Sequence, residues 1–124
     1  MNKYKVQITK EYTDQDMEDI VVTALEGGIG YWACLDNTGE VWDRMPEDLA
    51  TSEYAWRILK EDGELHFLDE EDDDAEYFLS LPCLMNGIRK AITGGQWDGD
   101  MDTVDAEVAD AIFQYAIFDD IIYG

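Results

Sequence analysis

Apolar residues near the start of the chain occupy every second position. Tyr4, Val6 and Ile8 alternate with polar neighbours between residues 3 and 10. A period of two places alternate side chains on one face of an extended backbone. The pattern therefore predicts a first β-strand with one buried face.

The apolar spacing becomes helical after Thr13. Thr13 and Asp16 have the spacing of a capping box, in which each side chain accepts a hydrogen bond from the other residue's backbone N–H. The apolar positions that follow at helical spacing are Met17, Ile20, Val21, Ala24 and Leu25. They predict a helix over residues 14–26, ended by Gly27 and Gly28, because glycine readily adopts the backbone angles of a helix end.

Two pairs of strands are expected next, separated by a helix. Residues 29–35 are apolar and aromatic, and residues 36–39 are typical of a turn, so we expect a hairpin with residues 40–42. A helix should begin at Pro46, with Leu49, Tyr54 and Ile58 facing inward, and end before Gly63. Alternating apolar positions on either side of residues 69–74 then predict two more strands, at Leu65 and Phe67 and at Tyr77 and Leu79.

The last third of the chain predicts two amphipathic helices. Pro82 begins the first, which has the inner stripe Leu84, Met85, Ile88 and Ile92 and ends at Gly94-Gly95. Asp105 is a suitable N-cap for the second, whose apolar face is Val108, Ala109, Ile112, Phe113, Ala116 and Ile117. With no repeat or linker, residues 1–124 are expected to form one α+β domain, a small antiparallel sheet covered by three to four helices.

Charge changes the functional interpretation of this fold. The chain has 30 acidic and 8 basic residues, a formal net charge of −22, while 46% of its residues are apolar, so it is expected to fold. Such a field repels nucleic acid and anionic membranes and attracts basic grooves. We therefore expect a basic nucleic-acid-binding host protein or nuclease complex as partner, with no direct binding of nucleic acid or membrane. In the alternative interpretation, the acidity serves solubility only.

Acidic residues are densest between residues 61 and 76, where no lysine or arginine interrupts them. The candidate partner-binding residues are Glu61, Asp62, Glu64, Asp69, Glu70, Glu71, Asp72, Asp73, Asp74 and Glu76. The unbroken run 69–74 is either a flexible, solvated loop or an acidic prong that takes the place of phosphates in a basic groove.

The sequence contains few residues in patterns that are typical of catalytic or metal sites. The single histidine, His66, alternates with Leu65 and Phe67 and is expected to point to solvent. No nucleophile, phosphate-loop or zinc motif occurs, and residues 98–103 lack the glycine and glutamate of a calcium loop, so we expect no enzyme, cofactor or specific metal site. Cys34 and Cys83 lie among apolar neighbours and are expected to be buried free thiols. One or two of the four tryptophans should serve an interface with basic residues.

Two segments carry a resemblance to other proteins. The block Leu-Glu-Gly-Gly-Ile-Gly-Tyr-Trp within residues 19–32, and residues 105–124, resemble a recurrent small acidic protein of phages and mobile elements. Such proteins are similar to inhibitors of host defence, including anti-CRISPR and anti-restriction proteins that imitate nucleic acid. The resemblance assigns no residue a function, and physically the block describes a helix end, a double-glycine turn and an aromatic strand.

These features combine into one leading hypothesis and one alternative. The first is a phage-type anti-defence inhibitor, most simply an anti-CRISPR, that occupies the positively charged nucleic-acid channel of a nuclease complex in the host cytoplasm. The cytoplasmic expectation rests on the lack of any apolar run long enough to cross a membrane and of a signal-peptide pattern. The alternative is an acidic phage accessory or regulatory protein that acts through a protein–protein interface.

Overall fold

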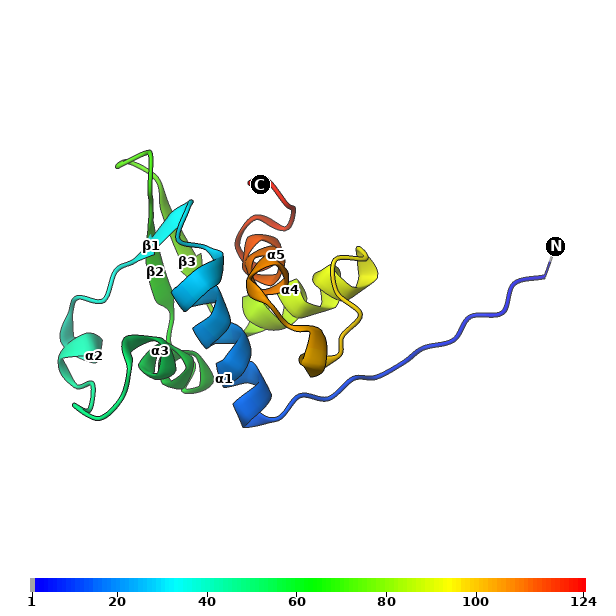
Figure 1. Ribbon diagram of the computed structural model, residues 1–124, viewed down its shortest axis with the longest axis horizontal. Coiled ribbons are helices and arrows are strands. Elements are labelled where there is room, and N and C mark those ends of the chain that lie inside the picture. The colour runs from blue at the N-terminus through cyan, green and yellow to red at the C-terminus, as the bar shows by residue number, and fades with distance from the viewer. Residues whose placement is uncertain (1) are drawn as a thin grey trace.

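The computed structural model describes residues 2–124 as a body of helices and strands with an extended amino-terminal arm (Figure 1). A three-stranded antiparallel sheet lies beside several helices, which confirms the predicted α+β fold. The helical elements are α1 (Asp14–Thr23), the π-helical turn η1 (Ala24–Gly28), α2 (Glu40–Asp43), α3 (Thr51–Lys60), α4 (Leu81–Thr93), the 3₁₀ turn η2 (Met101–Thr103) and α5 (Ala106–Phe118). The strands are β1 (Ala33–Leu35), β2 (Leu65–Asp69) and β3 (Glu76–Leu79).

The sheet has the order β1-β2-β3 and two different faces. Its inner face carries Leu65, Phe67 and Leu79, which are fully buried against the helices. Cross-strand register places Cys34 opposite Leu68 on the outer face, where both are exposed. The predicted hairpin of β2 and β3 is therefore confirmed, with its apolar alternation facing the core.

The predicted hairpin of residues 29–35 with residues 40–42 is wrong. Residues 40–43 form the helical turn α2, and β1 pairs with β2 instead. The Asp36 side chain accepts hydrogen bonds from the backbone and hydroxyl of Thr38, at 3.1 and 2.6 Å, and this turn directs the chain away from β1. Gly39 follows with φ of 109°, a backbone angle that favours glycine.

The start of α1 confirms the predicted capping box. Thr13 Oγ1 accepts from the N–H of Asp16, and Asp16 Oδ2 accepts from the N–H of Thr13, each at 3.0 Å. The helix continues through the π turn to Gly28, where an added Cβ would lie 3.0 Å from the carbonyl oxygen of Ala106. Residues 29–32 then form a turn in which Ile29 and Trp32 are buried and Tyr31 is exposed, so the strand predicted over 29–35 is shorter and begins at Ala33.

The later helices begin near, but not always at, their predicted caps. Helix α3 begins at Thr51 and not at Pro46, because residues 46–49 form a separate turn. Helix α5 begins after the predicted N-cap Asp105, whose side chain accepts from the N–H of Val108 at 2.9 Å. Helix α4 packs against α5, but Met85 of its predicted inner stripe is 51% exposed.

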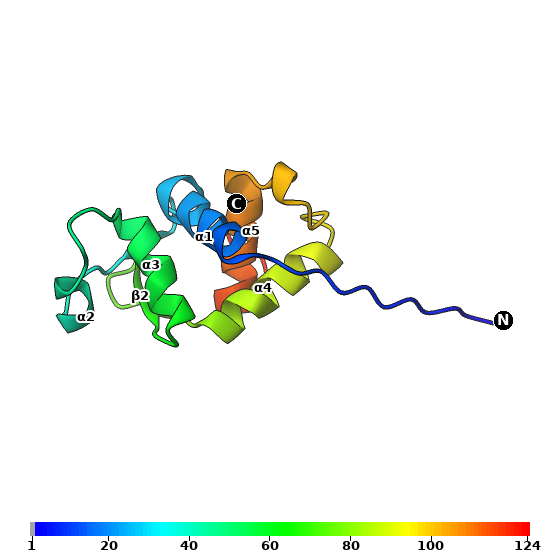
Figure 2. The same cartoon turned by 90° about the horizontal axis from the view of Figure 1, so that it is seen from below.

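The predicted first strand is also wrong. Residues 2–10 are extended but belong to no sheet, and their side chains are exposed (Figures 1 and 2). Alternation gives a segment one apolar face, but a strand also needs a neighbouring edge with free backbone groups. The three strands of the described sheet all lie between residues 33 and 79, away from this arm.

The expected burial of the two cysteines is wrong. Cys34 and Cys83 are both exposed, because Cys34 lies on the outer face of β1 and Cys83 lies in the first turn of α4. Trp32, Trp56 and Trp97 are buried in the core, which leaves the half-buried Trp42 as the one tryptophan of the four with substantial exposure. The interface role expected for one or two tryptophans stays a prediction, and Trp42 is the tryptophan whose exposure fits it.

Candidate functional site: the acidic β2–β3 hairpin

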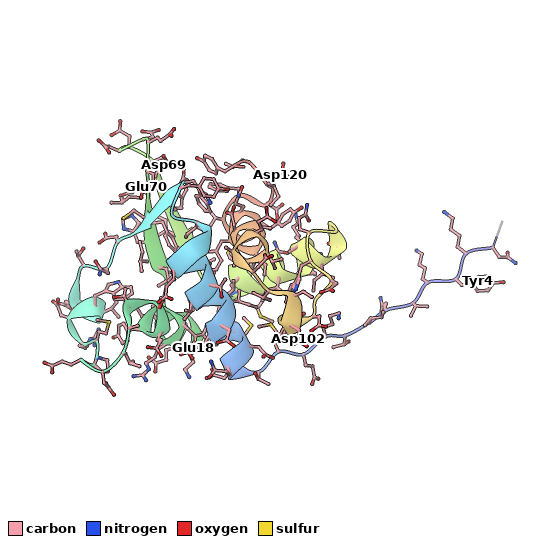
Figure 3. All side chains as sticks on the ribbon, in the orientation of Figure 1. Tyr4, Glu18, Asp69, Glu70, Asp102 and Asp120 are labelled. Carbon is pink, nitrogen blue, oxygen red and sulfur yellow. The ribbon has the colours of Figure 1, made fainter. Side chains whose placement is uncertain are left out.

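The ten predicted partner-binding residues divide between the two ends of the β2–β3 hairpin. Glu61, Asp62 and Glu64 come before β2, in the segment after α3. At the far end, residues 69–74 run from the last residue of β2 through the connecting loop, and Glu76 begins β3. Asp69 is five positions beyond Glu64 along an extended chain, a span of about 17 Å. Asp69 and Glu70 lie at the projecting tip (Figure 3). The prediction that all ten support one site is therefore too broad, and the tip is the coherent cluster.

The tip is held in shape by hydrogen bonds to its own carboxylates. Asp69 Oδ1 accepts from the backbone N–H groups of Glu71 and Asp72, at 2.8 and 2.9 Å. Asp72 Oδ1 accepts from the N–H of Asp74 at 3.0 Å, and the N–H of Ala75 donates to the carbonyl of Asp72. Aspartate favours such side-chain-to-backbone turns. Within the acidic run, two residues thus build the turn that presents the others.

Asp69 is also tied to the body of the protein. Its Oδ2 atom accepts from the hydroxyl of Tyr77 at 2.5 Å and from the hydroxyl of Tyr123 at 3.0 Å. The hydrogen bonds from Tyr77, from the tip backbone and from Tyr123 lower the pKa of Asp69 to about 2. Reciprocally, the hydrogen bond to Asp69 raises the pKa of Tyr77. The interpretation of the whole run as a solvated loop is therefore wrong for Asp69, which is half-buried and structural.

Four acidic side chains at the tip are exposed and do not take part in these hydrogen bonds. Glu70, Glu71, Asp73 and Asp74 are exposed and have no hydrogen bond through their carboxylates within residues 2–124. The backbone N–H of Glu70 donates to the carbonyl of Trp32 at 3.1 Å, which fixes the tip to the chain just before β1. We call these four residues the tip acids.

His66 lies on the outer face of the sheet, between two carboxylates. Its Nδ1 atom is 3.0 Å from Asp36 Oδ2, and its Nε2 atom is 3.2 Å from Glu76 Oε1. The ring stacks on Phe78 with a centroid distance of 4.9 Å. The hydroxyl of Thr38 and then His66 hold the pKa of Asp36 below its ordinary value. His66 was expected to point to solvent. It lies on the outer face of the sheet as the alternation indicates, but its neighbours leave the side chain only 28% exposed.

Exposed apolar side chains accompany the acids on this face. Phe78 is 54% exposed and Leu68 is 38% exposed. Leu68 lies opposite Glu76 and Phe78 lies opposite His66, so the two apolar side chains are diagonal neighbours at the base of the tip. The sequence analysis did not predict this patch, because it placed the alternate residues of β2 and β3 in solvent. The signal in the sequence was that two of those alternate residues are large and apolar.

The two segments that carry the resemblance to phage proteins meet in space, where residues 31 and 32 contact helix α5. Trp32 Nε1 and the hydroxyl of Tyr31 donate to the two carboxylate oxygens of Asp110, at 2.8 and 2.5 Å. Burial and the hydrogen bond to Asp110 raise the pKa of Tyr31 to about 12. The buried amide of Gln114 accepts from two backbone N–H groups of the carboxyl-terminal tail, including that of Tyr123. These contacts favour a structural role for both segments.

Comparison with known proteins identifies no family for this chain. No family model, no curated protein and no solved structure matches this chain. The resemblance to phage proteins therefore stays a prediction. None of the helices within residues 2–124 is long and apolar enough to cross a membrane. In the same residues, no three histidine, cysteine or acidic side chains gather with the geometry of a metal site.

Proposed function

We propose that this protein inhibits a nucleic-acid-processing complex by inserting its acidic β2–β3 hairpin into a positively charged channel that otherwise holds DNA or RNA. In this proposal it is a binding protein and not an enzyme. The resemblance to phage proteins makes a host-defence nuclease in the host cytoplasm, such as a CRISPR effector complex, the expected target.

The observation that carries the proposal is the built tip. Asp69 and Asp72 hold the backbone turn, so the tip acids are presented by a shaped loop that is tied to the sheet and to Tyr123. A backbone turn that is formed before binding reduces the entropy that binding must overcome. The carboxylates that it presents can accept hydrogen bonds from arginine and lysine in the way that phosphate oxygens do.

The net charge also favours binding to a basic channel, and it acts over a longer range than the contacts of the tip. At −22, the protein is attracted to basic grooves from beyond contact distance, and this attraction raises the association rate. The outer sheet face adds contacts that do not depend on charge. Phe78 and Leu68 offer exposed apolar surface beside the tip, and the ring of Phe78 can stack on an arginine side chain.

The test is a comparison of two variants with equal charge. The first replaces the tip acids by amides (Glu70→Gln, Glu71→Gln, Asp73→Asn and Asp74→Asn). The control replaces four exposed or half-exposed acids on other elements (Glu18→Gln, Asp19→Asn, Glu47→Gln and Asp48→Asn). Each variant removes four negative charges, and each leaves the turn-forming Asp69 and Asp72 in place.

Binding is measured on the target recovered from host lysate, at ~50 mM and ~300 mM salt. We expect wild-type affinity to fall about tenfold or more over this range, the tip variant to lose far more affinity than the control, and preloading with nucleic acid to block binding. Equal losses of affinity in the two variants would show that net charge, and not the tip, determines binding. Simultaneous binding of the protein and nucleic acid would contradict competition.

A second function has support from the outer sheet face alone. An accessory or regulatory protein that binds through Leu68, Phe78 and the exposed Cys34 would use charge for solubility only. Its binding would be insensitive to salt and to the tip substitutions, but Phe78→Ser would abolish it. The same lysate experiment therefore separates the two functions.

A further inference from the structure

The amino-terminal arm, residues 2–11, differs chemically from the rest of the protein. It holds three of the eight basic residues, Lys3, Lys5 and Lys10, and one of the 30 acidic residues. Its apolar face, formed by Tyr4, Val6 and Ile8, is between 80% and 89% exposed. No backbone hydrogen bond joins residues 2–11 to the rest of the described chain. An extended segment with free backbone groups and one apolar face is a template for pairing with another strand.

The arm leaves the body at a defined point. Tyr12 stacks on Trp97 with a centroid distance of 5.6 Å, and its hydroxyl donates to the carbonyl of Gly99 at 2.8 Å. The side chain of Lys10 lies over Gly99, where an added Cβ would be 2.8 Å from Lys10 Cδ. The base of the arm, where it joins the body, is therefore anchored, and Tyr4 lies far out toward its free end (Figure 3).

A groove lies between the arm and helix α4. Its volume is about 700 Å³, and its walls are Val6 and Ile8 of the arm and Met85, Ile88 and Ile92 of α4. Figure 2 shows the arm running outward past the end of this helix. Met85, the exposed member of the predicted inner stripe, faces this groove and not the core. An apolar strand that entered the groove would cover both walls.

We propose that the groove is filled by the arm of a second copy of this chain, and that the two arms form an antiparallel ribbon centred on Val6. A two-fold axis through this residue pairs Val6 with itself, Tyr4 with Ile8 and Lys5 with Gln7. All three apolar side chains of each arm then lie on one face of the ribbon, toward α4. In this register no lysine lies opposite another lysine.

Charge complementarity identifies the second copy as the occupant. The same register puts Lys3 of the second copy opposite Thr9, next to the anchored base of the first arm. The acidic residues Asp98, Asp100 and Asp102 follow Trp97 at that base, and the charge of Lys10 already acts on Asp98. A second copy thus supplies a matching apolar strand, and its Lys3 places a cation near this acidic loop, which offsets part of the repulsion between the two bodies. A nucleic acid would meet the same repulsion and would supply neither the strand nor the cation.

The first test is the mass of the full-length protein in solution, by light scattering after size exclusion, at ~5 to ~100 μM. We expect twice the 14.2 kDa monomer mass at the higher concentrations. Because the two bodies repel each other, dimerisation should strengthen as salt rises, opposite to the proposed binding of a basic partner. Ile8→Asn should weaken the dimer at least tenfold, and Gln7→Asn, on the other face of the arm, should not. A monomer at every concentration, or a dimer unaffected by Ile8→Asn, would overturn the proposal.

The second test fixes the register. In a background with Cys34→Ser and Cys83→Ser, mild oxidation should link Val6→Cys to its counterpart, because directly opposed residues have Cβ atoms about 4.5–5.5 Å apart. Gln7→Cys is the control, since residue 7 and its counterpart lie on a diagonal about 7–8 Å apart, too far for a disulfide. Equal linkage of the two variants, or none in either, would refute the ribbon.

Discussion

Replacing Gly87 by alanine tests how closely helices α4 and α5 pack. Gly87 lies in the middle of α4 and is buried against α5. A Cβ at this position would overlap the carbonyl oxygen of Ile112, and it would lie 2.8 Å from the Cβ and 2.9 Å from the backbone nitrogen of Ala116. Backbone atoms cannot rotate away as a side chain can, so the two helices would have to separate.

The expected magnitude is the difference of two opposing terms. Overpacking in a core costs about 1–3 kcal/mol, and the upper end applies here because the obstacles include backbone atoms. Alanine in a helix interior recovers about 1 kcal/mol relative to glycine. The free energy of unfolding should therefore fall by about 2 kcal/mol, which is about 8 °C in melting temperature for a domain of this size.

The measurement is thermal unfolding followed by circular dichroism, with Gly30→Ala as control. Gly30 has no atom within 4 Å of an added Cβ, and its φ lies outside the left-handed region. The control should change the melting temperature by about 2 °C or less. If Gly87→Ala melts at or above the wild-type temperature, the close contact between α4 and α5 does not exist as described.

Three further outcomes follow from particular contacts. Gln114→Leu should cost about 2–3 kcal/mol, because the tail N–H groups that its buried amide binds lose their partner, and acrylamide quenching of Trp32 should rise as Tyr123 detaches from it. The folded-state pKa of Asp69, about 2, is below the unfolded value of about 3.9, so its stabilisation is complete above pH ~4 and is lost as pH falls through 2. Melting temperatures between pH 4 and 2 should accordingly fall more steeply for wild type than for Asp69→Asn, and parallel curves would contradict this. Cys34 and Cys83 should both react with a thiol reagent without denaturant, whereas protection of either until unfolding would show that it is buried.

Much of the local structure could be predicted from the sequence. The capping box at Thr13, the N-cap Asp105 and the alternation on either side of residues 69–74 each depend on neighbours within a few residues. Such short-range hydrogen bonds and periodicities can be predicted without knowledge of the rest of the fold. The concentration of acids at the hairpin tip can be predicted in the same way.

The candidate site was predicted only in outline. The sequence places the tip acids together, but it treats Asp69 as one more charge, because its partners Tyr77 and Tyr123 are 8 and 54 residues away. It also includes Glu61, Asp62 and Glu64, which are near in number but lie beyond the other end of β2. Gln114 lies one turn after Asp110 and outside the predicted apolar face of α5, so the apolar pattern gave no signal of the network that holds the tail.

The sequence by itself determined the fold class, the starts of the best-capped helices, the β2–β3 hairpin and the strongly negative charge. Only the tertiary structure decided that β1 pairs with β2 across more than thirty residues, and that the alternating arm pairs with nothing in its own chain. The physical reason is that alternation specifies a face, while pairing requires a free edge, and the edges available depend on the whole arrangement of elements. The exposure of Cys34 and Cys83 follows from the same cause, since an apolar neighbourhood in sequence does not determine which side of an element meets the core.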